Sequence, residues 1–360
     1  LFRSKLLTGS SYLTAKLTGK YVIDQFLAKG SFRPLYNRDG TINKENCSLY
    51  CRPDQIAECA YSFEIAGTVT EEAAKESGLK KGTPVIVGTG DSTAEAISVG
   101  LVESGTVFFQ YGSSMFYYYC VDRYVDDYVS ANGNGSLKGG KEFTIPGIFC
   151  IGDGTNAAGT LTRWVRDTFY EEELKKERAG GENAYAVMAR EAAEVEAGSE
   201  GLIILPYIYG ERSPIQDAKA SGMLFGLKGT HTRKQINRAA LEAVGYSTLQ
   251  HMILFDEMNL PPKSVITAGG GTKNAAWMQI ICDMIGRQIC IPKRYQCSAY
   301  GDAAMAALGD RRFRDFTELR DSLPKGKILV PNEKNHIYYK EHYKMFRDLY
   351  LNNKDMMHRI

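Results

Sequence analysis

The chain has 360 residues, which is enough for two domains and more than one hydrophobic core usually fills. Hydrophobic residues make up 44% and charged residues 24%, as in an ordinary globular protein. The formal net charge is only +2, so charge gives no support for a nucleic acid or a membrane surface as a partner. No apolar run in the sequence approaches the ~20 residues that span a bilayer.

The beginning of the chain and its cysteines bear on where the protein works. The first residues, Leu1-Phe2-Arg3-Ser4-Lys5, show neither an initiator Met nor the apolar segment of a signal peptide. We therefore expect the chain to start inside a longer protein or after a cleavage, and we expect a cytoplasmic location. The eight cysteines show no paired zinc-site spacing, which favours reduced thiols and predicts no metal site built from them.

The first 90 residues combine one helix, one long polar segment and one strand. Residues 5–20 have the leucine spacing of an amphipathic helix that Gly19 would end. Residues 30–60 are polar, which predicts a long loop of the kind that is often functional or touches another domain. Residues 83–87 predict a short buried strand that leads into Gly88-Thr89-Gly90-Asp91.

From residue 83 onward, predicted strands and helices alternate, which indicates an α/β protein with a layered sheet. Residues 106–111 and 115–121 predict a hairpin around the small-residue turn Gly112-Ser113-Ser114. The other predicted strands are 202–206, 264–268 and 289–292, and the other predicted helices are 156–170, 183–196, 232–257, 274–285, 300–308 and 336–352.

Asp91 is the candidate catalytic residue. The segment Gly88-Thr89-Gly90-Asp91-Ser92-Thr93 begins like a dinucleotide fingerprint, but Thr93 stands where the third glycine belongs. At the end of a strand, Asp91 could instead present a carboxylate at the mouth of a cleft and accept a proton from an attacking hydroxyl. The alternative is that Asp91 only caps the helix that follows.

Three more glycine turns could bring backbone N–H groups close to phosphate oxygens. Gly112-Ser113-Ser114 offers N–H and O–H donors, or it is a plain tight turn. Gly269-Gly270-Gly271 would let an adenosine lie against bare backbone with Asn274 as a hydrogen-bonding partner, or it is a closely packed helix entry. Gly152-Asp153-Gly154-Thr155 is interpreted as a turn before the helix 156–170.

Taken together, these motifs resemble the FGGY family of carbohydrate kinases, and the xylulokinases in particular. Residues 84–91 look like the strand that carries the family's catalytic Asp, and Gly112-Ser113-Ser114 looks like its phosphate hairpin. The other similar segments are Gly210-Glu211-Arg212-Ser213-Pro214 with residues 222–227, residues 269–277, residues 283–287, Gly301-Asp302-Ala303-Ala304, and residues 12–19 at the end of the first domain. The resemblance covers nearly the whole chain.

The resemblance implies an actin-like, ribonuclease-H-like ATPase fold. Residues 1–84 would be the C-terminal remainder of a first, sugar-binding domain, residues 85–332 a second, nucleotide-binding domain, and residues 333–360 a C-terminal helix. Two departures concern the sugar side. No Asp-x-Gly-Thr phosphate loop precedes Leu1, and Asp24 is followed by Gln25-Phe26-Leu27 where the family usually has Asn-Ala-Ser. The isolated chain is therefore expected to be inactive.

The resemblance also implies a reaction, in which the γ-phosphoryl of ATP, with Mg²⁺, passes to a terminal hydroxyl of a small sugar. The sugar would be a ketose such as xylulose or ribulose, or a related polyol. Asp91 would be the general base and Ser92 a contact to the substrate. The residues implied to bind the nucleotide are Gly112, Ser113, Ser114, Gly159, Arg163, Gly270, Gly271 and Asn274. Glu211 and Arg212 are expected to form a buried structural pair.

A second hypothesis is an actin-like nucleotide-binding module without catalysis. The missing phosphate loop favours this module, whereas Asp91 favours the kinase. Under either hypothesis the expected partners are small molecules and no nucleic acid or membrane. The sequence leaves the oligomeric state open and is compatible with a homodimer.

Overall fold

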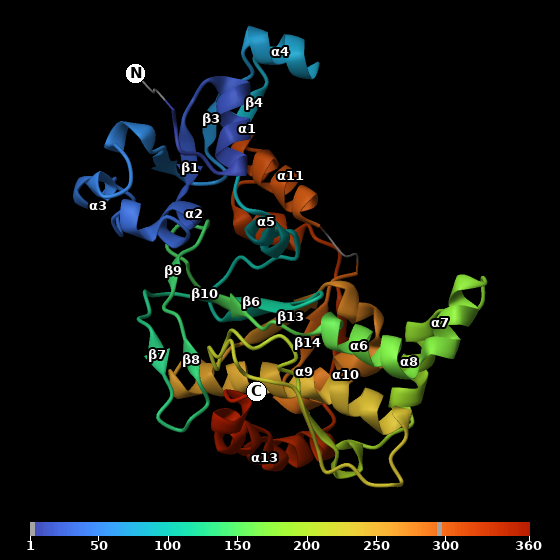
Figure 1. The fold of residues 1–360 in the computed structure, drawn as a ribbon. Coiled ribbons are helices and arrows are strands. Elements are labelled where there is room, and N and C mark those ends of the chain that lie inside the picture. Colours follow the sequence, from blue (N-terminus) through green and yellow to red (C-terminus); the bar gives the residue numbers. More distant parts are fainter. Residues whose placement is uncertain (1–3, 294–296) are drawn as a thin grey trace.

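The computed structural model describes residues 4–293 and 297–360, so the expectations on residues 1–3 lie outside the described part of the chain. Figure 1 shows an upper body built mainly from the N-terminal elements and a lower body built around a large sheet. The N-terminal elements are α1 (Gly9–Thr18), β1 (Val22–Asp24), α2 (Gln25–Gly30), α3 (Lys44–Ser48), β2 (Glu58–Ala60), β3 (Ile65–Thr68), α4 (Glu71–Ser77) and β4 (Pro84–Ile86).

The large sheet has seven strands in the order β15-β14-β13-β5-β6-β10-β9. β13 pairs in parallel with β5 and β14, and the other neighbouring strands are antiparallel. The strands are β5 (Thr106–Tyr111), β6 (Met115–Val121), β9 (Lys141–Glu142), β10 (Phe149–Gly154), β13 (Ser264–Ala268), β14 (Ile289–Ile291) and β15 (Lys327–Leu329).

Helices cover both faces of this sheet, so its central strands β5 and β6 are largely buried on both sides. Because side chains alternate along a strand, Phe109 and Tyr111 join the core on the side of α9, whereas Phe108 joins the core on the side of α5. The helices are α5 (Asp91–Ser98), α6 (Gly159–Phe169), α7 (Glu171–Arg178), α8 (Ala184–Ala193), α9 (Arg233–Glu257), α10 (Ala275–Ile285), α11 (Ser298–Gly309), α12 (Phe316–Asp321) and α13 (Glu333–Met357).

The structure confirms the predicted hairpin, whose strands β5 and β6 have the predicted bounds. The turn expected at Gly152-Asp153-Gly154-Thr155 was wrong, because residues 152–154 belong to β10 and pair with β6. Glycines suit this strand for a steric reason. A Cβ on Gly152 would lie 2.4 Å from the Tyr118 ring, and one on Gly154 would lie 2.4 Å from the Met115 carbonyl oxygen.

Other differences concern elements that the sequence patterns did not separate. The helix expected at 156–170 begins at Gly159, and α7, which follows it, was not predicted. The long loop expected at 30–60 contains α3, β2 and two single turns of 3₁₀-helix, at Arg33–Leu35 and Pro53–Gln55. α7 has no buried side chain, so it lacks the apolar periodicity on which a helix prediction depends.

The domain boundaries at residues 84 and 332 stay predictions. Tyr339 and Phe346 of α13 belong to the same core as Phe109 and Phe255, so the C-terminal helix packs as part of the lower body. Among residues 4–293 and 297–360, no helix is long and apolar enough to cross a bilayer. β11 (Ile203–Leu205) and β12 (Met223–Phe225) form a separate small antiparallel pair.

α5, which begins at Asp91, is held against α11 by a close backbone contact. A Cβ on Gly301 of α11 would lie 1.8 Å from the Ala94 carbonyl oxygen of α5. Because the neighbouring atom is backbone, no side-chain rotation could relieve this clash. Gly301 therefore allows the close approach of the two helices.

We expect Gly301→Ala to lower the free energy of unfolding by about 1–3 kcal/mol through overpacking. At a helix position without such a contact, alanine would instead be favoured over glycine by up to ~1 kcal/mol. Gly9→Ala is the matched control, since Gly9 begins α1 and its Cβ would have no neighbour within 4 Å. Urea unfolding measures both variants, and equal stabilities would contradict the proposed spacing role.

Candidate active site

A pocket of about 510 Å³ lies in the lower body, between the β5–β6 turn and the helices α6, α8, α9 and α10. Its volume falls within the range of small-ligand sites. The predicted nucleotide residues that line it are Gly112, Ser113, Gly159, Arg163, Gly270, Gly271 and Asn274. These residues come from three separate segments of the sequence. Ser114, the remaining predicted residue, does not line the pocket.

The β5–β6 turn is bonded directly to the beginning of α6. The carbonyl oxygen of Gly112 accepts a hydrogen bond of 2.9 Å from the Gly159 N–H, and that of Ser113 accepts bonds of 3.1 and 2.9 Å from the N–H groups of Ala158 and Thr160. A Cβ on Gly159 would lie 2.5 Å from the Gly112 oxygen. Gly159 is therefore required by packing, and the first amides of α6 are already satisfied.

Free donors and cations nevertheless remain around the turn. The hydroxyls of Ser113 and Ser114 have no hydrogen-bond partner among the described residues. Arg163 and Lys273 line the pocket with exposed side chains, and neither forms an ion pair within residues 4–293 and 297–360. This side of the pocket can therefore receive an anion such as a phosphate chain.

The glycine run after β13 has two different functions. A Cβ on Gly270 would meet nothing within 4 Å, so its backbone faces open space in the pocket. A Cβ on Gly271 would lie 2.8 Å from Cβ of Tyr111 and 2.9 Å from the Trp277 ring, so Gly271 is needed for close packing. Each of the two predicted alternatives is thus correct for one glycine: Gly270 offers bare backbone to a ligand, and Gly271 is a closely packed helix entry.

Asn274 is the N-cap of α10. Its Oδ1 accepts a hydrogen bond of 3.0 Å from the Trp277 N–H. The amide nitrogen Nδ2 makes no hydrogen bond to the described residues, so it can donate to a ligand in the pocket. One side chain can therefore both cap the helix and contact a nucleotide.

Sequence reasoning missed the far wall of the pocket, which α8 and α9 provide. This wall is made of Asn183, Tyr185, Ala186, Met188, Ala189, Asn237 and Leu241, with Trp277 beside it. Asn237 donates from Nδ2 to the Met188 carbonyl oxygen at 2.7 Å, while its buried Oδ1 and the buried Trp277 Nε1 have no partner in the described chain. The sequence signal for this wall was an Asn and a Trp within apolar patterns. Because buried polar groups usually need partners, such residues indicate a place where a ligand can bind.

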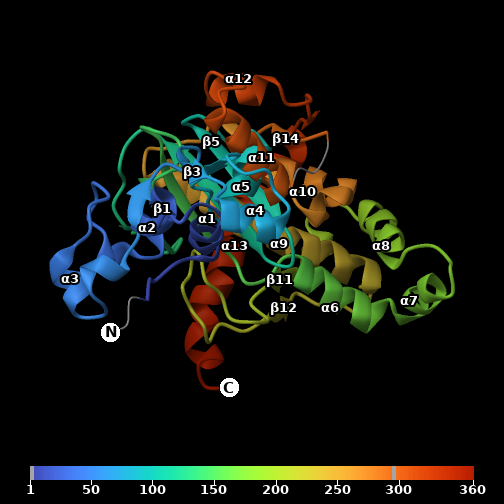
Figure 2. The same cartoon turned by 90° about the horizontal axis from the view of Figure 1, so that it is seen from above.

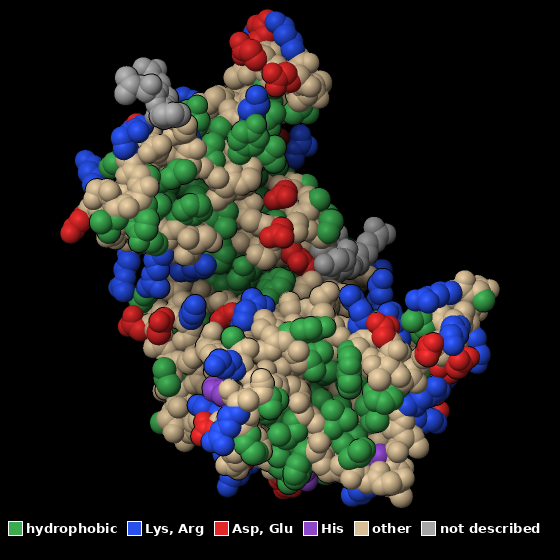
Figure 3. Space-filling model, in the orientation of Figure 1, with side chains coloured by type: hydrophobic (Ala, Val, Ile, Leu, Met, Phe, Trp, Pro, Cys, Tyr) green, Lys and Arg blue, Asp and Glu red, His purple; other side chains and the backbone are tan. Residues whose placement is uncertain are grey.

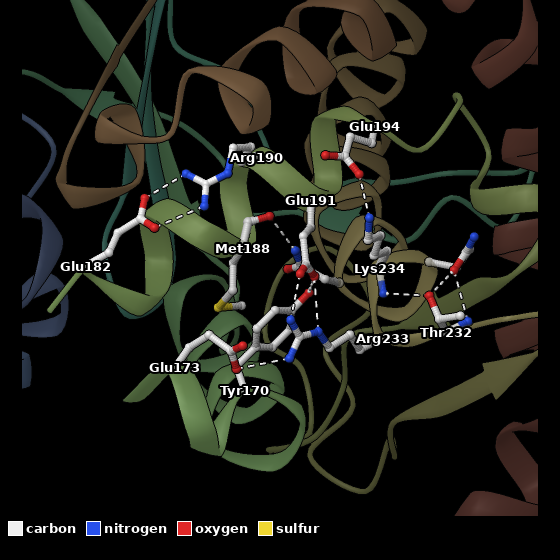
Figure 4. A network of polar contacts seen from close by, with 12 residues as sticks. Tyr170, Glu173, Glu182, Met188, Arg190, Glu191, Glu194, Thr232, Arg233 and Lys234 are labelled. Carbon is white, nitrogen blue, oxygen red and sulfur yellow. Dashed lines mark hydrogen bonds and ion pairs between the residues drawn. The ribbon is translucent and has the colours of Figure 1, made fainter. Parts of the chain in front are cut away.

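A polar network fixes α8 against the start of α9 (Figure 4). Arg233 donates to both carboxylate oxygens of Glu191, at 2.6 and 3.2 Å, and to Glu173 at 3.0 Å. Tyr170 donates to Glu191 at 2.7 Å. Because Arg233 thereby joins α7, α8 and α9, the far wall of the pocket is held in place from behind.

Asp91 lies outside the pocket, on the α5 side of the sheet. It is exposed, and its Oδ1 accepts a hydrogen bond of 2.8 Å from the Ser92 N–H. The N-cap position of α5 is Gly90, so Asp91 is the first helical residue and not the cap. Ser92 Oγ lies 2.8 Å from the Tyr118 hydroxyl, and Tyr118 stands four residues from Ser114, or about 14 Å along β6.

The surface is hollowed between the two bodies, and on the right of Figure 3 acidic side chains lie on the upper wall and Lys and Arg side chains on the lower. Asp302 of α11 stands near Asp91. Partial burial, together with the negative charge of Asp91, raises the pKa of Asp302 above its usual range. In the described part of the chain, no group of three or more His, Cys, Asp or Glu side chains could hold a metal ion.

Glu211 is buried, but the expected pair with Arg212 was wrong. Glu211 Oε1 accepts hydrogen bonds from the N–H groups of Asn156, at 2.6 Å, and Arg212, at 2.8 Å. The Arg212 side chain is exposed and donates instead to Asn156 Oδ1 and the Thr155 carbonyl oxygen. Glu211 thus joins the loop after β10 to the Gly210–Arg212 segment without a cation on its carboxylate.

Burial of Glu211 raises its pKa from 4.5 to about 7. An acid whose pKa is higher in the folded state contributes stability below its unfolded pKa and loses it as the pH rises through the folded pKa. We therefore expect the wild-type free energy of unfolding to lose up to ~3 kcal/mol from this group between about pH 4.5 and 7, at about 1.4 kcal/mol per pKa unit.

Glu211→Gln should remove this loss, so the stability difference between variant and wild type should move in favour of the variant as the pH rises. Urea unfolding at several pH values measures the difference. The exposed Glu72→Gln is the control for replacing a carboxylate by an amide, since the Glu72 side chain forms no hydrogen bond or ion pair with the described residues. A wild type and a Glu211→Gln variant with parallel pH profiles would contradict the burial argument.

Comparison with known proteins gives one consistent family. The model of the FGGY family of carbohydrate kinases, C-terminal domain, matches residues 112–309. Xylulose kinase from Staphylococcus epidermidis is 28% identical over 296 residues, which cover 82% of this chain and 56% of the relative. Gluconokinase from Bacillus subtilis is 26% identical over 324 residues, which cover 87% of this chain and 60% of the relative. The chain thus spans less than two thirds of the length of these relatives.

Solved structures agree with the family. Xylulose kinase from Rhodospirillum rubrum superposes with a TM-score of 0.84 at 27% identity, over 99% of this chain and 69% of that one. Glycerol kinase from Plasmodium falciparum, solved with ADP, shows the same fold with a TM-score of 0.78 at 16% identity, over 93% of this chain and 64% of that one. The fold is therefore the actin-like, ribonuclease-H-like ATPase fold, and the chain belongs to the FGGY family of carbohydrate kinases.

Proposed function

We propose that the protein to which this chain belongs transfers the γ-phosphoryl group of ATP to a terminal hydroxyl of a small sugar. One observation carries the proposal. A single pocket gathers the β5–β6 turn, the start of α6 and the start of α10, although these segments are far apart in the sequence. Membership of a carbohydrate kinase family and the exposed carboxylate of Asp91 support the same function.

In this proposal the adenosine lies along the open backbone of Gly270, with Asn274 Nδ2 as a hydrogen-bond donor. The phosphates reach the turn, where Ser113 and Ser114 offer free hydroxyls and Arg163 offers positive charge. Such a reaction depends mainly on positioning and on neutralising phosphate charge. These residues supply both without forming a covalent bond to the phosphoryl group.

Asp91 is the proposed general base. Its exposed carboxylate would accept the proton of the sugar hydroxyl and orient the hydroxyl oxygen toward the γ-phosphorus, with Ser92 beside it as the substrate contact. Mg²⁺, bound with ATP, would neutralise phosphate charge. This ion usually keeps several waters and binds few protein groups, so the Asp91 carboxylate would stay available to accept the proton.

The sugar is proposed from the relatives. Because these are named xylulose kinase and gluconokinase, the first compounds to try are xylulose, ribulose, gluconate and small polyols. We place the reaction in the cytoplasm, where ATP and reduced thiols are available, and all eight cysteines are free. A homodimer stays an untested prediction.

Asp91→Asn in the full-length protein should lower kcat for sugar-dependent ADP formation by at least ~10²-fold, as loss of a general base does. Asn retains an acceptor for the Ser92 N–H, so α5 should stay folded. The control is Asp315→Asn, which changes a carboxylate that caps the remote helix α12. Near-wild-type turnover of Asp91→Asn would rule out the base. A wild type that binds ATP but forms no ADP with any of the sugars would favour the non-catalytic module.

Asn274 can be tested separately because its two functions use different atoms. Asn274→Ser keeps an oxygen that can cap α10 but removes the amide donor, so KM for ATP should rise about 5- to 20-fold with little loss of stability, as for one lost hydrogen bond to a ligand. Asn332→Ala, which removes the cap of α13, should lower stability without changing KM for ATP. A change in the sugar KM alone after Asn274→Ser would refute the adenosine assignment.

A further inference from the structure

The loop that carries Asp91 is built from residues with little conformational preference of their own. It runs from β4 through Gly88, which has a φ of +73°, to Gly90 and then into α5. Glycine gives such a loop many accessible conformations, so contacts elsewhere must select one of them. Those contacts come from both sides of Asp91.

On the N-terminal side, Thr89 is tied to Asp24. The Thr89 hydroxyl donates to Asp24 Oδ2 at 2.6 Å, and both side chains are buried, with exposed fractions of 8% and 1%. Asp24 also accepts from the N–H groups of Phe26, at 3.3 Å, and Leu27, at 3.2 Å, and so caps α2. One carboxylate therefore joins an N-terminal helix to the loop before Asp91.

Keeping a carboxylate at this position is costly. Burial raises the pKa of Asp24 to about 6, even though three hydrogen bonds and the positive charge of Lys141 act in the opposite direction. A neutral Asn or Ser would cap a helix of six residues without burying a charge. The charge does strengthen the bond that Thr89 donates, because hydrogen bonds to ionised acceptors are about twice as strong as neutral ones.

On the C-terminal side, Ser92 is bonded to Tyr118 of β6, at 2.8 Å. The Tyr118 ring packs edge-on against Phe26, with ring centroids 5.6 Å apart, and Phe26 is two residues from Asp24. The contacts thus close a ring that runs from Asp24 to Thr89, through Asp91 to Ser92, across to Tyr118 and back through Phe26. Asp91 is a member of this ring whose own carboxylate stays exposed.

α2 is itself anchored, so the ring has a fixed base. Gln25 donates to the Phe143 carbonyl oxygen at 3.1 Å, and Phe26 packs edge-on against the Phe143 ring at 5.2 Å. Lys29 forms an ion pair of 2.5 Å with Glu142. These contacts attach α2 to β9 and to the residues that follow it in the lower body.

We propose that Asp24 is a positioning residue for Asp91, and that it sets the height and direction of the catalytic carboxylate through Thr89 while Tyr118 holds the other side. This inference rests on the proposed function for its catalytic consequence, but its structural part can be measured without any substrate. The three residues after Asp24, Gln25-Phe26-Leu27, differ from the usual family pattern. Two of them, Gln25 and Phe26, anchor α2 to Phe143 and so support the ring.

The structural part is tested by hydrogen exchange of the Gly88 and Ala94 amides, which bond to the carbonyl oxygens of Ser62 and Gly90 on either side of Asp91. Thr89→Val removes the hydroxyl at nearly constant shape, and Thr89→Ser retains it. We expect exchange of both amides to rise about 10-fold or more in Thr89→Val and to stay near wild type in Thr89→Ser, as when one hydrogen bond that orders a segment is lost. Unchanged exchange in Thr89→Val would overturn the proposal.

The catalytic part is tested by steady-state kinetics of the full-length protein. Thr89→Val should lower kcat about 10- to 100-fold with an unchanged KM for ATP, since misplacement of a reacting group by about 1 Å can cost 10²-fold. Thr89→Ser should restore most of kcat. Thr70→Val is the matched control, because the Thr70 hydroxyl caps the distant helix α4. Faster exchange with an unchanged kcat would overturn the positioning role.

Failure of the proposed function would look different from failure of this inference. If the wild type forms no sugar-dependent ADP, the proposed function fails, while the exchange rates of Thr89→Val and Thr89→Ser still decide whether the ring holds the loop. Tyr118→Phe provides a second variant, since it removes the Ser92 bond from the other side of the ring and should raise exchange at Ala94 more than at Gly88.

Discussion

Two carbonyl oxygens, those of Gly112 and Ser113, determine how the pocket of this molecule is built. They accept the first N–H groups of α6 and so fix a helix to the turn of the central hairpin. Gly159 must be glycine for this contact, because any Cβ would lie 2.5 Å from the Gly112 oxygen. The pocket exists because the turn and the helix cannot separate without leaving both carbonyls and amides unpaired.

This contact also decides which groups remain for an anion. In many phosphate sites the free amides at a helix N-terminus bind the phosphate. Here the turn has already taken the amides of α6, so the available groups are the hydroxyls of Ser113 and Ser114 and the side chains of Arg163 and Lys273. On the right of the hollow in Figure 3, acidic side chains lie on the upper wall. This arrangement suits the proposed reaction, in which a neutral sugar hydroxyl lies between the Asp91 carboxylate and the phosphates. The net charge of +2 does not reveal this separation of acidic and basic side chains.

Sequence patterns predicted the fold well wherever a local preference and the tertiary contact agree. The hairpin of β5 and β6, the strand β13 and the helix α9 combine apolar periodicity with clear turn or capping residues. The prediction failed where distant contacts decide. Gly152 and Gly154 look like turn residues, but they lie in a strand because Tyr118 and Met115 approach their backbone. The far wall of the pocket was missed because nothing in α8 shows by itself that α9 brings Asn237 to it.

The position of Asp91 is the strongest case of this difference between local sequence and structure. Residues 88–92 identify a carboxylate after a strand, but two glycines leave its direction undetermined. Its direction comes from Asp24, 67 positions earlier, and from Tyr118, which lies in a different body of the molecule. Because Asp24 caps α2 and α2 is fixed to β9, a change in the N-terminal part of the chain reaches the carboxylate through one buried hydrogen bond. A substitution at residues 25–27 can therefore alter the direction of the proposed base without changing the residues that surround Asp91 in the sequence.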